Sequence, residues 1–563
     1  MIGSLPPFAI LLAAAALLPL VPVAWRSAWS IVAVLVGIAN LMLLPDGVGW
    51  TVQLMGLELA PLHVDELSFL FGLLFHIAGL IGIIFAWHVR SLVEQSSSLV
   101  YASSALGAVF AGDMITLFVF WEMMAVSSVF LILARGTERA TRAGLRYLLV
   151  QITSGVVLLA GIIVRYVETG SLEFSFIGLE GLGATLIFLA FGVKCCWPML
   201  HTWLTDAYPE ATPTGTVFLS AFTTKVAVYA LCRAFPGAEP LIFIGAAMAM
   251  FPIFYAVIEN DLRRVLAYSL INQVGFMVVG IGLGTEMALN GAVSHAFNDV
   301  LFKGLLFMSM GAVLHMTGRI NGSDLGGLYK SMPITATFCI IGAASISAFP
   351  LFSGFVSKSM VMTAAAEEGY TVVFLLLLFA SAGVFHHAGI KIPYFAFFAH
   401  DSGIRTKEAP INMLIAMGIA ALFCVFNGSY PALLYSLLPW EVNYEPYTLT
   451  HVITQTQLLF FSALAFALLM KSGIYPPELR LINLDADWFG RRLFSRAATA
   501  AGRGISHAWD AAINGANAQI AALIRAIYRH HGPRGVLART WPIGSTVLWI
   551  AALLSIYLVT HYA

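Results

Sequence analysis

Five of the eight lysines in the sequence fall within long apolar segments or at a break in one, where a charged side chain lacks water around it. A lysine at the centre of a bilayer costs about 2.5–3.5 kcal/mol. Arginine stays protonated there, whereas a desolvated lysine can lower its pKa by several units and exchange a proton. These five lysines are therefore candidate proton carriers. They are Lys194, Lys225, Lys303, Lys358 and Lys391.

Glu122 is an acidic residue with apolar sequence on both sides, in the stretch Phe118-Val-Phe-Trp-Glu-Met-Met. A carboxylate there is the natural counter-charge for one of the buried lysines, because an isolated charge is expensive away from water. A purely structural ion pair is the competing interpretation. For Lys391 the competing interpretation is snorkelling, in which a long side chain near a helix end carries its charge to the membrane surface.

Three ionisable residues recur at steps of four along one apolar segment: His295, Asp299 and Lys303. Residues four apart lie on the same face of a helix. Histidine is the side chain whose ordinary pKa lies nearest neutrality. A histidine, a carboxylate and a lysine on one helical stripe therefore predict a proton relay.

Two of the lysines lie beside interruptions of their helices. Lys194 precedes Cys195-Cys196-Trp197-Pro198, and Lys358 follows Phe349-Pro-Leu-Phe-Ser-Gly354. Proline and glycine free backbone carbonyls within a span, which is tolerated where the break lines a polar cavity. The steps from Lys194 to Lys225 and from Lys358 to Lys391, 31 and 33 residues, are nearly equal. Paired broken helices of opposite direction are typical of inverted repeats with ion sites at the midplane.

The elements that must position these residues are membrane-spanning helices. The sequence is 60% hydrophobic and only 10% charged, against about 25% charged in soluble domains. Its zero net charge argues against a nucleic-acid partner. The first apolar run, Phe8 to Ala24, lacks a basic start and a cleavage site, so we expect a spanning helix and not a removed signal peptide. Sixteen spans are predicted, near 8–24, 30–45, 66–88, 98–112, 114–134, 144–165, 183–203, 214–235, 239–259, 264–284, 287–315, 334–352, 371–399, 411–428, 454–470 and 542–561.

Loop charges orient these spans. With an external N-terminus, the loops predicted to be cytoplasmic hold Arg26, Arg90, Arg135, Arg139, Arg142, Arg263, Arg264, Arg319, Lys330, Arg405 and Lys407. The opposite loops are nearly free of lysine and arginine, and the long one at 428–453 has neither. This positive-inside bias predicts that both termini lie outside.

From Lys471 to Arg539 the chain becomes polar and rich in arginine. Apolar residues recur in it at helical steps, which predicts an amphipathic helix; they are Ile505, Trp509, Ile513, Ile520, Ile524 and Ile527. It either lies on the cytoplasmic leaflet or braces a neighbouring subunit. The fold class expected is an all-α polytopic membrane protein with two inverted repeats and this lateral helix. Its parts are N-terminal helices 1–97, repeats 98–238 and 239–400, C-terminal helices 401–475, a cytoplasmic arm 476–541 and a final helix 542–563.

The sequence gives no sign of a cofactor or a metal. Its five cysteines form no CxxC and no Cys/His cluster with the spacing of metal ligands. The adjacent Cys195 and Cys196 are expected to act as small buried apolar side chains. Because Walker A, GxGxxG and iron–sulfur patterns are absent too, we expect neither nucleotide hydrolysis nor redox chemistry in this chain.

Several stretches together resemble one known family, the antiporter-like membrane subunits shared by Mrp-type cation/proton antiporters and respiratory complex I, and most resemble the Mrp D subunit. They cover roughly residues 60–400 in order and are Trp121-Glu-Met123, Gly192-Val-Lys194, Pro198-Met-Leu-His-Thr-Trp-Leu-Thr-Asp206-Ala, Pro213-Thr, Arg264-Val-Leu-Ala-Tyr-Ser, Gln273-Val-Gly, Asn298-Asp-Val-Leu-Phe-Lys-Gly-Leu-Leu-Phe and Phe349-Pro-Leu-Phe-Ser-Gly-Phe-Val-Ser-Lys358.

The resemblance implies roles for most of the candidate residues. Glu122 and Lys194 would be the interacting pair of a first half-channel, and Lys225 the central relay. Lys358 would be the terminal lysine of the second half-channel, with His295 and Lys303 on the polar axis between. Asp299 departs from the pattern, because the family usually carries a histidine there. The polar tail resembles a shorter version of the lateral-helix arm of the distal complex I subunit.

The resemblance also implies a function in the bacterial inner membrane. We expect a proton-translocating Na⁺/H⁺ antiporter subunit with other membrane subunits as partners. The alternatives are a proton-pumping subunit of a complex I-like or hydrogenase-like enzyme, an energy-coupling subunit of an inorganic-carbon uptake complex, and a structural scaffold. A scaffold predicts that the buried charges can be neutralised without harm, whereas the other three functions differ in their partners.

Overall fold

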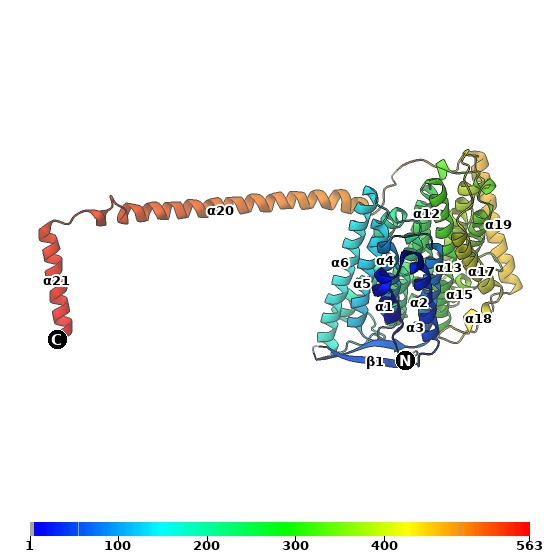
Figure 1. The fold of residues 1–563 in the computed structure, drawn as a ribbon, viewed down its shortest axis with the longest axis horizontal. Helices are drawn as coiled ribbons and strands as arrows, with labels where there is room; N and C mark the ends of the chain where they lie inside the picture. The colour runs from blue at the N-terminus through cyan, green and yellow to red at the C-terminus, as the bar shows by residue number, and fades with distance from the viewer. Residues whose placement is uncertain (1–4, 55, 482, 563) are drawn as a thin grey trace. The chain divides into compact units, whose positions relative to one another are not determined.

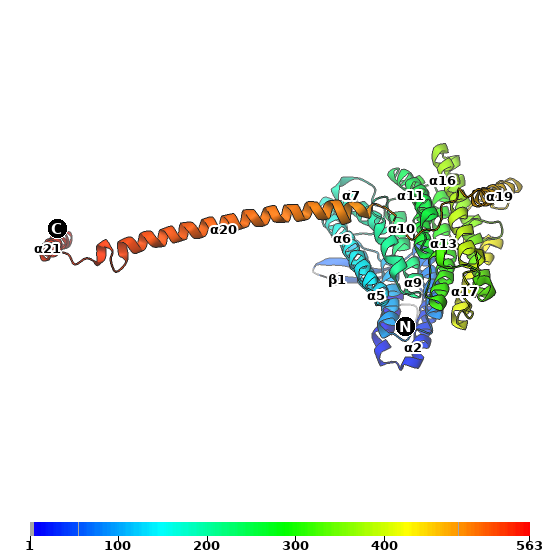
Figure 2. The same cartoon turned by 90° about the horizontal axis from the view of Figure 1, so that it is seen from above.

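The structure is a computed structural model that describes residues 5–54, 56–481 and 483–562. The chain forms two compact units, residues 1–483 and 484–563. The first is a bundle of apolar helices, in which α6 and α19 lie at opposite ends in both views (Figures 1 and 2).

Several helices begin at an aspartate that caps their first turn. Asp65, Asp113 and Asp261 each accept a backbone N–H of the helix that follows, α3, α5 and α12 respectively. A side-chain oxygen at this position satisfies donors that have no partner within the helix. The helices of the first unit are α1 Pro7–Leu17, α2 Arg26–Leu41, α3 Glu66–Phe85, α4 Leu92–Val109, α5 Met114–Leu133, α6 Glu138–Thr169, α7 Gly181–Lys194, α8 Thr202–Ala207, α9 Gly215–Ala221, α10 Thr223–Ala234, α11 Pro240–Ile258, α12 Leu262–Leu283, α13 Glu286–Thr317, α14 Pro333–Ile346, α15 Ser353–Glu367, α16 Thr371–Val384, α17 Ile411–Ser429, α18 Pro431–Tyr435 and α19 Leu449–Ser472.

Shorter helical segments lie between them. Two π-helices, η6 Phe385–Lys391 and η7 Tyr394–Phe398, continue α16. The 3₁₀ turns of this unit are η1 Leu18–Leu20, η2 Val23–Trp25, η3 Tyr208–Glu210, η4 Gly322–Asp324 and η5 Leu328–Lys330. π-helical turns inside α-helices are frequently found at functional sites, and η6 carries Lys391.

Twelve helices in the described part of the chain are long and apolar enough to cross a membrane, and three apolar helices are shorter. Every span predicted from the sequence overlaps a helix of the structure. The structure interrupts several predicted spans, among them 183–203, 214–235 and 334–352, because α7 ends at Lys194, α9 at Ala221 and α14 at Ile346. The separate helix α15, which carries Lys358, was not among the predicted spans.

The predicted helix breaks coincide with unusual backbone conformations. After α7, Cys196 and Met199 have φ of 63° and 70°, and after α14, Ala348 and Leu351 have φ of 59° and 73°. Non-glycine residues seldom adopt this left-handed region. A third break, at Phe222, separates α9 from α10.

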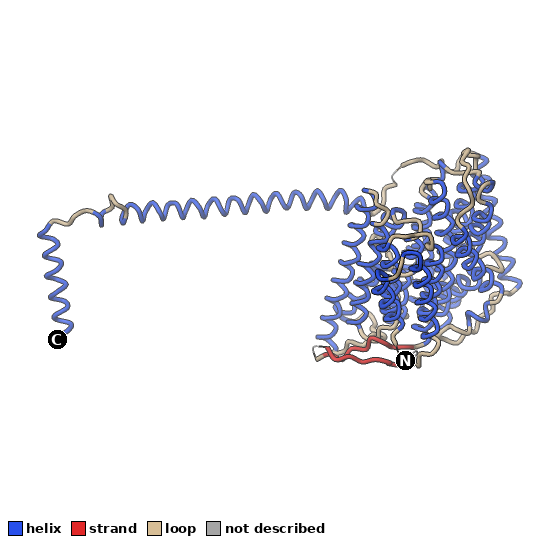
Figure 3. The backbone as a smooth tube through the Cα atoms, in the orientation of Figure 1, coloured by secondary structure: helices blue, strands red, loops and turns tan. Residues whose placement is uncertain are grey.

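One element of the first unit is not helical. Strands β1 (Gly47–Leu54) and β2 (Leu57–Val64) pair antiparallel, and Figure 3 shows this hairpin along one edge of the bundle. The chain is mostly helical, as predicted, but the expectation of an all-α fold did not include this hairpin. Its second strand attaches to the bundle through Ala60, whose N–H donates to Asp113.

The second unit contains the predicted amphipathic segment. Its elements are the π-helix η8 (Phe489–Phe494), α20 (Ser495–His531), the 3₁₀ turn η9 (Val536–Ala538) and α21 (Ile543–Tyr562). Helix α20 is a single helix of 37 residues. Trp509, Ile513 and Ile524 on its apolar stripe are exposed.

Candidate functional site

Lys194 lies at the C-terminal end of α7, immediately before the break, and is completely buried. Its ammonium donates to the backbone carbonyl of Trp121 at 2.5 Å and lies 4.4 Å from the centre of the Trp121 ring. Glu122, the next residue on α5, is half-buried, and it and Lys194 interact electrostatically. No ion pair within 4 Å joins the two side chains in the described structure. Glu122 and Lys194, predicted to be an interacting pair, therefore interact through their charges without direct contact. The direct contact of Lys194 is with Trp121.

Lys225 on α10 forms the central ion pair of the bundle. Its Nζ lies 2.5 Å from Oδ2 of Asp299 on α13, and both side chains are fully buried. It also donates to the carbonyl of Ser220 at 3.3 Å, across the break between α9 and α10. Among the described residues, neither carboxylate oxygen of Asp299 accepts a well-aligned hydrogen bond. The lysine is thus the counter-charge of Asp299, and the pair joins the two halves of the sequence.

His295 and Lys303 each lie four residues from Asp299 on α13, one before it and one after it, and both are also buried. The His295 ring contacts the Ser357 hydroxyl at 3.0 Å and Oε1 of Gln273 at 3.2 Å. Lys303 donates to the Ser269 hydroxyl at 2.8 Å. From one face of α13, His295 contacts α12 and α15, Asp299 contacts α10, and Lys303 contacts α12.

Lys358 occupies the second turn of α15, just beyond the break after α14. Its ammonium donates to the carbonyl of Ile346 at 2.8 Å and lies 5.2 Å from the ring centre of Phe276. Ile346 is the last residue of α14, and carbonyls at a helix end lack a partner within the helix. The break therefore supplies the acceptor of Lys358. The residue before Lys358, Ser357, binds His295 of α13.

Lys391 lies at the end of η6, fully buried, and it does not snorkel to the surface. Its ammonium donates to the carbonyls of Val257 and Glu259 at 2.7 and 2.6 Å. It also forms an ion pair with Glu478 at 2.9 Å. The snorkelling interpretation of Lys391 is therefore wrong for this structure.

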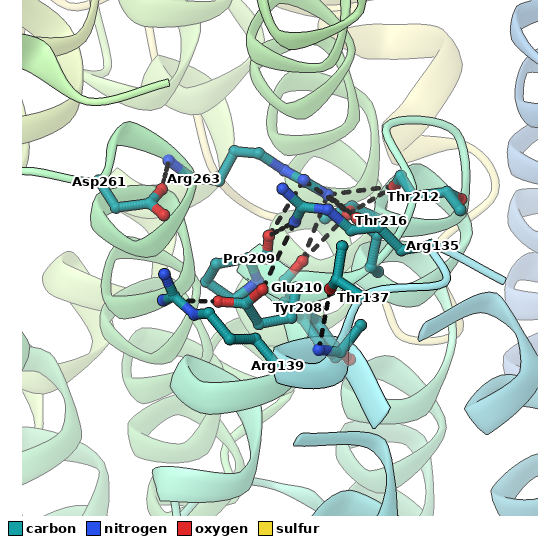
Figure 4. A network of polar contacts seen from close by, with 12 residues as sticks. Arg135, Thr137, Arg139, Tyr208, Pro209, Glu210, Thr212, Thr216, Asp261 and Arg263 are labelled. Carbon is teal, nitrogen blue, oxygen red and sulfur yellow. Dashed lines mark hydrogen bonds and ion pairs between the residues drawn. The ribbon is translucent and has the colours of Figure 1, made fainter. Parts of the chain in front are cut away.

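The turn between α8 and α9, which precedes Lys225 in the chain, is fixed by arginines (Figure 4). The buried Arg263 donates to the carbonyls of Pro209, Ala211 and Thr212 at 3.1 Å. Glu210 in the turn is paired with Arg139 at 2.8 Å and with Arg135 at 3.7 Å. Charged donors make stronger hydrogen bonds than neutral ones. These arginines thus hold the backbone that leads into the broken helix α9–α10.

The structure brings most of the predicted residues into one buried polar series, with Lys225, His295, Asp299, Lys303 and Lys358 on three packed helices. Glu122 and Lys194 belong to other helices, α5 and α7, and Lys391 belongs to η6. Sequence reasoning missed Glu478, because it follows a Tyr-Pro-Pro turn in the polar tail, where a glutamate is ordinarily solvated. It also missed His387, four residues before Lys391. That spacing was the available signal for His387.

Metal binding receives no support from the described residues. No group of three or more His, Cys, Asp or Glu is arranged there to hold a metal ion. All five cysteines are buried and free, and Cys195 and Cys196 lie in the backbone break after Lys194. What this series of groups can do chemically is pass protons between neighbouring lysine, histidine and carboxylate side chains.

Residues 111–385 match the family model described as NADH:quinone oxidoreductase/Mrp antiporter, TM. The D subunit of the Na⁺/H⁺ antiporter of Alkalihalophilus pseudofirmus is 32% identical over 308 residues, 50% of this chain and 62% of the relative. This chain spans only about half to three-fifths of the length of such curated relatives, with shares of 62%, 52% and 55%.

Two solved structures have a similar fold. One is a chain of the Mrp complex from a Dietzia species, with a TM-score of 0.67, 19% identity and coverage of 83% of this chain and 98% of that one. The other is a chain of the membrane-bound sulfane sulfur reductase, an archaeal respiratory membrane complex. It has a TM-score of 0.71, 24% identity and coverage of 99% and 100%.

Proposed function

We propose that this chain is a proton-translocating subunit of a multi-subunit membrane complex. The premise is that residues 111–385 belong to the NADH:quinone oxidoreductase/Mrp antiporter transmembrane family. That membership agrees with the resemblance found in the sequence motifs. The finer proposal is a monovalent cation/proton antiporter subunit that exchanges Na⁺ for H⁺. The likeness to the Na⁺/H⁺ antiporter relative supports this choice.

The Lys225–Asp299 ion pair is the observation that carries the proposal. Removing two charges from water costs several kcal/mol per ion, and a bundle that needed only stability would place apolar residues there. Three further ionisable side chains, His295, Lys303 and Lys358, lie buried on the same or adjoining helices. Buried ionisable groups on packed helices provide successive sites that a proton can occupy.

In the proposed path Glu122 and Lys194 form the first half-channel, residues 98–238, and Lys225 passes protons to Asp299. His295 and Lys303 continue the path into the second half-channel, residues 239–400, where Lys358 is the terminal lysine. The helix breaks beside Lys194, Lys225 and Lys358 support this assignment. Each leaves backbone carbonyls that can solvate an ammonium ion without exposure to lipid.

The arrangement of the remaining parts is also proposed. We place the chain in a bacterial inner membrane, with about sixteen spans and both termini outside. The amphipathic α20 would lie on the cytoplasmic side as a lateral helix, braced by neighbouring membrane subunits.

Transport in everted vesicles that contain the whole complex tests the function. After an inward proton gradient is imposed, added Na⁺ should discharge it only when the complete chain is present. Discharge that is equal without this chain, or that does not respond to Na⁺, would contradict the antiporter assignment.

A redox-driven proton pump is the second candidate. It is favoured by the likeness to the sulfane sulfur reductase chain, which extends over 99% of this chain, whereas the Mrp likeness covers 83%. Mass spectrometry of the purified complex separates the two, because a pump requires partners that hold iron–sulfur clusters. A zinc-bearing partner would instead indicate the inorganic-carbon uptake system.

A further inference from the structure

A cavity with several polar side chains in a largely apolar wall lies beside the segment that follows α19. It has a volume of about 350 Å³, and its lining includes Ser323, His400 and Glu478. Glu478 belongs to the short stretch Tyr475-Pro-Pro-Glu, and its side chain is only 6% exposed. A carboxylate at the wall of a cavity large enough for water can exchange protons with that water.

Glu478 connects this cavity to the buried Lys391. The two side chains form an ion pair at 2.9 Å, and Lys391 is not exposed at all. Within the described residues, no other hydrogen-bond donor reaches the Glu478 carboxylate. Burial raises the pKa of this carboxyl group, an effect opposed by the Lys391 ammonium. The Glu478 side chain therefore lines the cavity, while its two carboxylate oxygens are buried on the side of Lys391.

His387 lies on the same π-helix as Lys391, four residues earlier, and is completely buried. Among the described residues, neither ring nitrogen makes a hydrogen bond of good geometry, and the polar neighbour of the ring is the backbone of Gly383. Buried polar groups are ordinarily satisfied, so each exception requires an explanation. The ring is close enough to Lys391 and to Lys303 on α13 to sense both charges. An imidazole in that position can accept a proton at one nitrogen and release another from the opposite nitrogen.

We propose that Glu478 is the proton-access residue of the second half of the bundle, and that protons pass between the cavity and Lys303 through Glu478, Lys391 and His387. The inference rests on the proposed function. In one step the Lys391 ammonium gives its proton to His387 and becomes a neutral amine. Glu478 then transfers a proton, taken from cavity water, to this amine and returns to the carboxylate. One proton has moved inward. Glu478, Lys391 and His387 regain their starting charges when His387 passes its proton to a neutral Lys303, which becomes an ammonium ion.

A structural role is the competing explanation for the same contacts. Val257 and Glu259 lie at the C-terminal end of α11, so Lys391 also caps that helix. A cation there is favourable because of the helix dipole. Glu478 would then serve only to neutralise the lysine. This role does not account for the buried His387 ring one helical step from Lys391 or for the cavity at Glu478.

The test compares Glu478→Gln with Glu478→Asp in everted vesicles that contain the whole complex, with Glu445→Gln as the exposed control. We expect Glu478→Gln to reduce proton transport at least tenfold at equal amounts of assembled complex. Glu478→Asp should keep a measurable part of the activity, and Glu445→Gln should leave it unchanged. Normal transport by Glu478→Gln would overturn the proposal.

A double variant keeps the proposal falsifiable if Glu478→Gln assembles poorly. Lys391→Gln combined with Glu478→Gln removes both charges, so no unpaired ion remains buried. The double variant should assemble and remain inactive, and recovery of transport would show that Glu478 only neutralises Lys391. Lys358→Arg in the same assay separates the two claims. If it is inactive while Glu478→Gln is active, only this inference fails, and if both are active, the proposed function fails as well.

Discussion

At the scale of single residues, the buried pair Lys225 and Asp299 allows stability and the proposed transport to be tested together. Asp299→Asn would leave a buried ammonium without its counter-charge, which costs about 3–5 kcal/mol. We expect this variant to lower the midpoint of thermal unfolding of the purified complex and to lose transport. The double variant Lys225→Met with Asp299→Leu should regain stability but not transport. Full activity of Asp299→Asn would show that the pair is dispensable.

Glu122 provides a second test at this scale. Its carboxylate lies against Gly155 of α6, where a methyl group would collide with it. We expect Glu122→Gln to abolish transport while the complex still assembles, because the volume is kept and the charge near Lys194 is removed. Assembly is measured on a native gel and transport in everted vesicles. If Glu122→Gln transports normally, Glu122 has only a structural role.

Residue types could be predicted from the sequence, whereas several partners could not. Lysines in apolar segments could be recognised because each is costly to insert into a membrane. The spacing of His295, Asp299 and Lys303 places them on one face of a helix. Whether Asp299 meets Lys225 or Lys303 depends on how α10 packs against α13, which no local pattern specifies. The same holds for Lys391 and Glu478, which lie far apart in the sequence and meet only through the tertiary fold.

At the scale of elements, the broken helices were predictable because Pro198 and Pro350 interrupt apolar runs. The break at Phe222 was not predictable, because it contains no proline or glycine. It appears only in the backbone angles. The β1–β2 hairpin was missed because its residues, such as Trp50 and Leu54, lie between two longer apolar segments.

The direction of the elements across the membrane gives a further prediction. Cysteines introduced in 430–450 should react with an impermeant thiol reagent added from outside, and cysteines in 403–408 should not. The five native cysteines are buried, so their background labelling should be low. The opposite pattern of labelling would reverse the proposed orientation and remove the support for inverted repeats.

At the scale of the whole molecule, the unit from 484 to 563 is expected to hold the complex together. Its helix α20 carries exposed apolar residues such as Trp509 and Ile520, and an exposed apolar stripe marks a surface that is covered by a partner or by lipid. Deleting 486–563 should leave the chain inserted but loosen the complex on a native gel. An intact assembly after the deletion would favour a helix that merely lies on the membrane.

Proton transport through Lys358 tests the central claim most directly. The side chain lies buried beyond a helix break and donates to the Ile346 carbonyl. Arginine would keep the positive charge but would not release its proton, so Lys358→Arg separates a relay from an anchor. The measurement is the proton gradient formed by everted vesicles at equal amounts of assembled complex. We predict that Lys358→Arg transports no more than Lys358→Ala, and full transport by Lys358→Arg would contradict the relay.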